Sequence, residues 1–147
     1  MTADLNLVQE LASADDFLGV VGVARPDGSV HASLVKAGVL PEPLDGEPSV
    51  GMVVTGNARK LHHLRRVGRA TVVFKDGWRW ASVEGAVTLL GPDDHLAKAD
   101  LDLPQVVREV YKAAGGTHDD WDEFDRIMAE DRRCAVFVRT DEIRGSG

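Results

Sequence analysis

The sequence is poor in cysteine and in long apolar runs. Cys134 is the one cysteine among 147 residues, which excludes an intramolecular disulfide and any metal site with several cysteine ligands. No apolar stretch approaches the roughly 20 residues that cross a bilayer. The first residues, MTADLNLVQELASADDF, lack both the basic part and the continuous apolar part of a signal peptide. We therefore expect a cytoplasmic protein that has no membrane partner.

Motifs for catalysis by side chains are also missing. The sequence contains no Walker A loop and no zincin motif, and neither Ser33 nor Ser82 lies in a nucleophile elbow. His62 and His63 are adjacent, so on a helix they point about 100 degrees apart and cannot chelate one metal as an i, i+4 pair would. We predict no metal site and no catalytic side chain. Such a chain is suited to cofactor chemistry, because the protein then has to position a cofactor and a substrate rather than supply reactive side chains.

Acidic residues outnumber basic ones. With 24 Asp and Glu against 17 Lys and Arg, the formal net charge is −7, and the pI is near 5.1. This balance argues against nucleic acid as the main partner, because non-specific binding to a phosphate backbone needs a basic surface. The length and the 44% hydrophobic content indicate a single globular domain over residues 1–147.

One segment departs from this acidic average. Residues 55–69 hold five of the seventeen Lys and Arg, and no Asp or Glu occurs between Pro48 and Lys75. The run from Ser49 to Thr55 is apolar and β-branched, which predicts a strand. Asn57 is a good N-cap for a helix that runs from there to Val67. A strand that leads into a basic helix is therefore expected here.

Two cations, Arg59 and Lys60, fall in the first turn of this predicted helix. The helix dipole disfavours positive charge there by roughly a few tenths of a kcal/mol per residue. The arrangement makes sense if an anion sits at the helix start, held by free backbone N–H groups and by these cations. We predict that Lys60 contacts a phosphate, with Arg59 second and Arg65 and Arg66 weaker. The alternative is a solvated helix with a surplus of basic residues.

Trp78 and Trp80 flank Arg79 at strand spacing, so both indoles are expected on the same side of a strand. A paired aromatic wall suits stacking on a planar ligand or packing across a dimer interface. Packing within the core of the chain is the alternative.

Periodicity and turn signals predict a mainly β protein with accessory helices. Strands dominate the first ninety residues and come as hairpins, so the sheet should be mainly antiparallel and a small barrel with helices outside it is favoured. The expected strands are residues 17–25, 30–40, 49–55, 69–74, 78–90 and 132–140.

Four helices are expected. The first follows a cap at Thr2 or Asp4, and the second is the basic helix. The third begins near residues 91–94 and bends or breaks near Pro104. The fourth is capped by Thr117 and runs through Asp131, and the tail to residue 147 is expected to be loose.

Three segments in order resemble the split β-barrel flavin and deazaflavin oxidoreductases, relatives of pyridoxamine 5′-phosphate oxidase. They are GSVHASLV at residues 28–35, ARKLHHLRRVGRATVVF at 58–74 and GWRWASVEGAVTL at 77–89. The run VYKAAGGTHDDWDEFDRIMAEDRRCAVFV at 110–138 is similar to the actinobacterial branch that uses the deazaflavin coenzyme F420. The resemblance covers nearly the whole chain, and its most specific parts are KxxxLRRxxR, GWxxxxxEG and DWDxxxxxMxxDRR.

The resemblance implies a homodimer of six-stranded antiparallel split barrels, the FMN-binding split-barrel fold, with two cofactor sites at the subunit interface. Lys60 matches the phosphate-binding lysine of the family, and Asn57 and Arg59 lie beside it. Other matched cofactor-binding positions are Ser33, Leu34 and Val35 on one strand, Val53, Val54 and Thr55 on the next, and Trp78 and Trp80, which the second subunit would contribute.

The function implied is that of an F420-dependent oxidoreductase. Reduced deazaflavin would pass a hydride to a small unsaturated or oxidised organic substrate. The alternatives are an FMN-binding oxidoreductase of the same fold, or a non-catalytic protein that binds F420, flavin or haem. The sequence departs from the family pattern at Leu34, Ala58 and His63, the last of which stands where an asparagine is common.

Overall fold

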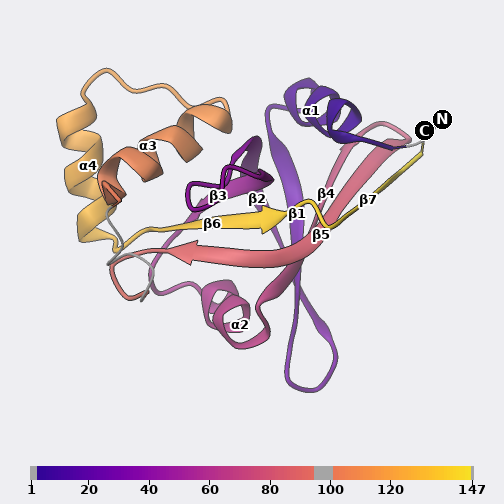
Figure 1. Cartoon of the computed structure of the whole chain (residues 1–147), viewed down its shortest axis with the longest axis horizontal. Helices are drawn as coiled ribbons and strands as arrows, with labels where there is room; N and C mark the ends of the chain where they lie inside the picture. Colours follow the sequence, from indigo (N-terminus) through magenta and orange to yellow (C-terminus); the bar gives the residue numbers. More distant parts are fainter. Residues whose placement is uncertain (1–2, 95–100, 147) are drawn as a thin grey trace.

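The computed structural model describes residues 3–94 and 101–146. Figure 1 shows the arrangement of the elements. Their order along the chain is α1 (Leu5–Ala14), β1 (Leu18–Ala24), β2 (Val30–Pro41), β3 (Pro48–Val54), α2 (Arg59–Val67), β4 (Arg69–Asp76), β5 (Arg79–Leu90), α3 (Leu103–Ala113), α4 (Trp121–Glu130), β6 (Cys134–Arg139) and β7 (Glu142–Gly145).

Six antiparallel strands close into a barrel, which confirms the predicted architecture. Neighbours follow the order β1, β2, β3, β6, β5 and β4, and β4 pairs back with β1. Within the barrel, the two longest strands each pair with one neighbour over their first part and with another over the rest. β2 pairs with β1 as far as Lys36 and with β3 from Ala37 onward. β5 pairs with β4 as far as Ala86 and with β6 from Val87 onward. The barrel is therefore split where these strands change partner.

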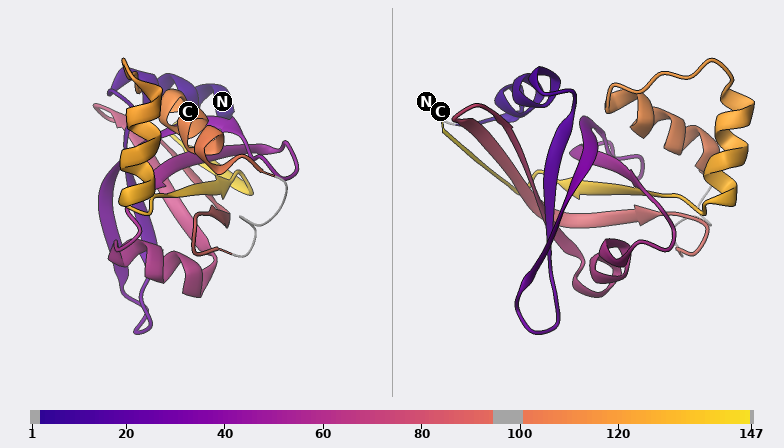
Figure 2. Two further views of the ribbon diagram at one scale, coloured as in Figure 1. Left: turned by 90° about the vertical axis from the view of Figure 1, so that its left-hand side faces the viewer. Right: turned by 180° about the vertical axis from the view of Figure 1, so that it is seen from behind.

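The first hairpin forms where the sequence predicts it. Asp27 accepts hydrogen bonds from the backbone N–H and the hydroxyl of Ser29, and Gly28 adopts a φ of 88°, which glycine reaches without steric cost. This turn sends β2 back along β1. Figures 1 and 2 show that the tip of the hairpin extends past the barrel.

Two apolar clusters hold the fold together. The larger fills the barrel and includes Leu11 of α1 and Leu61 and Leu64 of α2, all fully buried. The smaller lies between the accessory helices α3 and α4 and the outer face of the sheet, around Phe124 and Phe137. Figure 2 shows α3 and α4 together on one side of the barrel. This second layer builds one wall of the candidate site.

The chain end differs from the prediction. Residues 142–145, expected in a loose tail, form β7, which pairs with the outer part of β5 at Val83↔Ile143. Such pairing depends on an edge of β5 that local periodicity does not reveal.

The helix boundaries after β5 also differ. Residues 91–94 form turns, and the predicted helix start there continues into residues outside the described ranges. Pro104 lies in the first turn of α3, where its missing N–H costs nothing, rather than at a bend. Asp120 caps α4 by accepting a hydrogen bond from the Glu123 N–H, a role that the sequence analysis gave to Thr117. Among the described residues no helix has the length and apolarity to cross a membrane.

Candidate functional site

A cavity of about 480 Å³ lies at the split between β2 and β3. The two strands are paired as far as Ala37↔Met52. Before Ala37, β2 pairs with β1 instead, whereas β3 keeps its pairing with β6 through Val54. Six of the predicted cofactor-binding residues line the space that this divergence opens: Leu34, Val35, Val53, Val54, Thr55 and Lys60. The structure therefore brings the predicted strand positions and the predicted lysine to one place.

Lys60 is half-buried and enters the cavity from the first turn of α2. Desolvation by burial lowers the pKa of its ammonium group, and the Lys60 side chain forms no ion pair with any of the described residues. A buried cation without a counter-charge is costly, so the site favours an anion that would take up this charge.

Lys36, which is ion-paired with Asp16, and Arg133 also line the cavity. Arg133 is a cation that the sequence analysis missed. It stands between α4 and β6, and its backbone N–H donates to the Met128 carbonyl. Nη2 lies 3.3 Å from Asp131 Oδ2, whereas Nε is buried without a hydrogen-bond partner in the described part of the chain. An unpaired buried donor costs about 1–3 kcal/mol, which an accepting oxygen in the cavity would remove.

The accessory helices supply the remaining wall, which sequence patterns did not mark. Val110, Tyr111 and Ala114 come from the end of α3, and Met128 comes from α4. Gly38 lets α3 approach the sheet, because a Cβ there would lie 2.0 Å from the Ala113 carbonyl oxygen. None of the described lining residues is an Asp or Glu, although the chain as a whole is acidic.

The start of α2 differs from the prediction. Asn57 does not cap the helix. The N-cap is Ala58, which has no side-chain acceptor, and α2 begins at Arg59. Within the described chain the backbone N–H groups of Arg59 and Lys60 find no protein acceptor. The first turn thus keeps free donors and carries no acid, as an anion site requires.

Four further predicted residues lie outside the cavity of the single chain. Ser33 precedes the lining strand positions, and its buried Oγ has no hydrogen-bond partner among the described residues. Arg59 is exposed. Trp78 is 97% exposed in the turn before β5, and Trp80 is also exposed. Core packing of the two indoles is therefore wrong, and contact with a second subunit stays a prediction.

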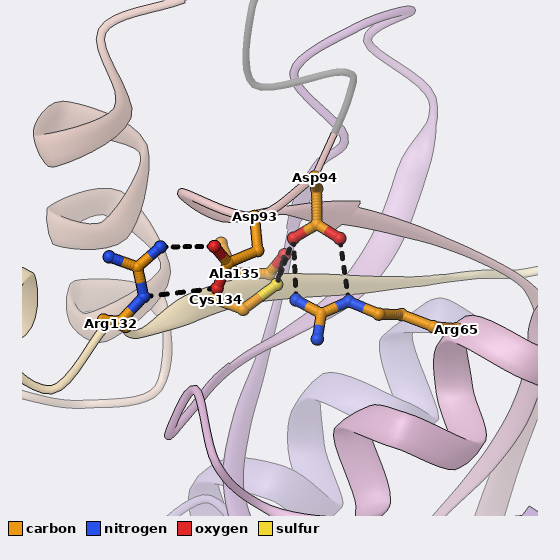
Figure 3. A network of polar contacts seen from close by, with 6 residues as sticks. All are labelled: Arg65, Asp93, Asp94, Arg132, Cys134 and Ala135. Carbon is orange, nitrogen blue, oxygen red and sulfur yellow. Dashed lines mark hydrogen bonds and ion pairs between the residues drawn. The ribbon is translucent and has the colours of Figure 1, made fainter.

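Two arginines of α2 point to other partners. Arg65 forms a paired contact with Asp94, Nε to Oδ1 at 3.0 Å and Nη2 to Oδ2 at 3.3 Å, and the hydrogen bond raises the pKa of Arg65. Figure 3 shows that Asp94 also faces the Cys134 sulfur, at 3.3 Å. Arg66 donates from Nη2 to the Ala24 carbonyl at 2.7 Å. Neither side chain lines the cavity.

Cys134 is buried, as predicted. Burial and the neighbouring Asp94 carboxylate raise the pKa of its thiol, so it stays protonated and unreactive at neutral pH. Within the described residues no group of three or more His, Cys, Asp or Glu is arranged to hold a metal ion.

The closed six-stranded barrel with a cavity at its split defines the class of fold. No family model matches the chain. Among solved structures it is similar to a pyridoxamine 5′-phosphate oxidase-related, FMN-binding protein from Nostoc punctiforme, with 10% identity, a TM-score of 0.61 and coverage of 96% of this chain and 80% of that one. An F420 reductase matches with 16% identity and a TM-score of 0.57, over 87% of this chain and 89% of that one.

A haem-binding protein from Mycobacterium smegmatis has 15% identity and a TM-score of 0.62, and the match covers 96% of this chain and 54% of that one. Likeness at such identities shows the fold. The chain therefore has the split-barrel fold of the pyridoxamine 5′-phosphate oxidase-related proteins, and its structural neighbours include an F420 reductase.

Proposed function

We propose that this protein is an F420-dependent oxidoreductase that transfers a hydride between the deazaflavin and a small unsaturated or oxidised organic substrate. One observation carries the proposal. The cavity at the barrel split holds Lys60 and Arg133, has no acidic side chain among its described lining residues, and belongs to a fold shared with an F420 reductase.

The residues present fit a flavin-like group with a phosphate. Lys60 has lost hydration without gaining an ion pair among the described residues, and the buried Nε of Arg133 has no hydrogen-bond partner among them. A phosphate between them would satisfy both through charge-assisted hydrogen bonds. Val35, Val53 and Val54 give the lining apolar groups that would contact a ring system.

The chain would position the cofactor and the substrate rather than supply reactive groups. Bound F420 would supply the hydride donor. Lys60 and Arg133 would hold its phosphate, and the two strands would keep its ring beside the substrate and exclude water. No side chain is assigned a proton transfer or a covalent step.

A homodimer is part of the proposal. The β1–β2 hairpin exposes large apolar side chains, with Leu34 64% and Val30 60% exposed. Leu34 also lines the cavity. A second copy that covered this strand would bury these side chains and close the cavity, and Trp78 and Trp80 of each copy would then be available to the other's site.

Titration of the purified protein with oxidised and reduced F420, followed by F420 fluorescence, tests the proposal. We expect saturable binding with a dissociation constant below about 50 µM. Hydride transfer is then sought by following F420 absorbance with a panel of quinones, enones and nitro compounds. A flat titration would remove the support for an F420 enzyme.

FMN is the second candidate, favoured by the FMN-binding neighbour. If the purified protein is yellow and releases flavin on denaturation, FMN is the cofactor. Tight binding without turnover of any acceptor would instead indicate a carrier of F420, flavin or haem, and the haem-binding neighbour makes haem part of that comparison.

A further inference from the structure

Five basic side chains gather beside the β1–β2 hairpin and α2, outside the lining of the cavity. We call them the histidine–arginine cluster: Arg25, His31, His62, His63 and Arg66. The ring centroids of His31 and His63 lie 5.7 Å apart, and those of His62 and His63 lie 5.6 Å apart. The cluster thus joins β2 to the outward face of α2.

Backbone carbonyls hold both guanidinium groups of the cluster in place. Arg66 Nη2 donates to the Ala24 carbonyl at 2.7 Å, and Arg25 Nη1 donates to the Val30 carbonyl at 2.9 Å. Ala24 and Val30 face each other as the last pair of the β1–β2 ladder. The two arginines are therefore anchored at the same end of the ladder, next to His31, and each keeps further N–H groups for a ligand.

The histidines have unmet hydrogen-bonding capacity. The Nδ1 atoms of His31 and His63 are buried without a partner in the described chain. Of the described histidine side chains only that of His118, on another part of the fold, forms a hydrogen bond. Burial lowers the pKa of His63, and the neighbouring His62, His31, Arg66 and Arg25 lower it further. Protonation of His63 is therefore disfavoured unless a counter-charge is present.

The groups that face the cluster are mostly cationic. Arg59 lies one turn before His63 on α2. On the hairpin, Asp27 interacts with Arg25, but its carboxylate already accepts two hydrogen bonds from Ser29. The arginines disfavour a divalent metal ion, and the described histidines do not form a metal-binding group. An anion is the ligand that this charge distribution selects.

We propose that the histidine–arginine cluster binds a small oxyanion that carries two or more negative charges, and holds it more tightly in weakly acidic solution than at neutral pH. The fixed guanidinium groups give bidentate contacts to the oxyanion. The anion supplies the counter-charge that a protonated His63 needs, so binding is coupled to proton uptake by His63. This site does not depend on the proposed cofactor.

The test uses the full chain in a buffer free of multivalent anions. Calorimetric titrations with pyrophosphate and with citrate at about pH 5.8 and about pH 7.5 separate phosphate-type from carboxylate-type ligands. We expect affinity about tenfold higher at the lower pH, because each unit by which an anion raises an imidazole pKa corresponds to about tenfold in affinity. Histidine ring NMR signals should show His63 protonating at higher pH when the anion is present.

Three variants locate the binding. His63→Asn should reduce the acid preference, whereas His118→Asn should keep it. Lys60→Met, which changes the cavity, should also keep it. Thermal unfolding at about pH 7.5 checks that each variant is folded. Absence of saturable binding, equal affinity at both pH values, or loss of binding in Lys60→Met would overturn the proposal.

Discussion

Lys60, Arg65 and Arg66 lie within one short helix, yet each meets a different environment. Lys60 lines the cavity without an ion pair to a described residue. Arg65 is paired with Asp94, and Arg66 with a backbone carbonyl. From the sequence, Lys60 is the first candidate for an anion contact, and Arg65 and Arg66 are weaker candidates. The tertiary contacts leave Lys60 as the one of these three that faces the cavity.

Replacing Lys60 by Met should weaken binding of F420 or FMN by about 10- to 100-fold, because a charge-assisted hydrogen bond contributes about 1.5–3 kcal/mol. Fluorescence titration measures the change. Lys75→Met is the matched control, since Lys75 is exposed on β4 and lies outside the cavity lining. Equal affinity in both variants would show that Lys60 does not hold the cofactor.

His63 should make folding stability sensitive to acid. Its pKa is lowered in the folded state, mainly by burial. The unfolded chain therefore binds more protons between the ordinary histidine pKa, about 6.5, and the lower folded pKa. Stability is fully present above pH 6.5 or so and falls as the pH drops through that window.

Urea denaturation of His63→Asn and of the unmodified protein at several pH values, in a buffer without multivalent anions, measures this effect. The unmodified protein should lose stability toward acid more steeply than the variant. His118→Asn should behave as the unmodified protein does. Parallel pH profiles for all three proteins would contradict the assignment.

At the scale of elements, the polar network in Figure 3 connects α2 to the end of β5 and the start of β6. Asp94 is only 10% exposed and binds Arg65, whereas Asp93 is 48% exposed and pairs with the exposed Arg132. The two adjacent carboxylates therefore differ in burial. A buried paired charge is costly to disrupt, and an exposed pair contributes little.

Asp94→Asn should destabilise the protein by about 1–3 kcal/mol, because Arg65 loses a charged partner in a poorly hydrated position. Asp93→Asn should cost less than about 1 kcal/mol. Urea denaturation of the two variants gives the comparison. Because α2 carries Lys60, Asp94→Asn should also weaken cofactor binding, and an effect of Asp93→Asn as large as that of Asp94→Asn would refute the role of the network.

Elements whose signals are local were predicted well. The first hairpin follows its Pro-Asp-Gly turn, and α1 begins after Asp4, whose carboxylate accepts the Leu7 N–H. Elements that depend on distant partners were predicted poorly. β7 forms because β5 offers it an edge, and Pro104 opens α3 instead of bending a helix.

At the scale of the whole molecule, the barrel buries its interior but leaves apolar side chains on the β1–β2 hairpin in solvent. Exposed apolar groups on adjacent strands are typical of an interface. The same hairpin borders the cavity through Leu34. Dimerisation and cofactor binding are therefore expected to be coupled.

Leu34→Glu should convert the proposed dimer to a monomer and weaken cofactor binding, because a charge would be buried at the centre of the contact. Size-exclusion chromatography with light scattering gives the mass of each species. Leu44→Glu is the matched control, since Leu44 is a leucine with 42% exposure in the loop between β2 and β3. A monomeric unmodified protein would overturn the dimer, whatever the variants do.

The amino-acid sequence alone predicts the hairpins, the acid-free strand-to-helix segment and the choice of Lys60. These features follow from residue types at short spacing, where backbone geometry and capping dominate. A resemblance carried by the same segments supplied the strand positions that now line the cavity.

The three-dimensional fold determines which basic side chains remain available to a ligand and which residues surround them. Arg133, Tyr111 and Met128 meet Lys60 because α3 and α4 fold back against the sheet. Arg65 is removed from the candidate site by Asp94, which follows β5. Desolvation and ion pairing depend on which side chains are close in space. The spacing of residues along the chain does not predict those contacts.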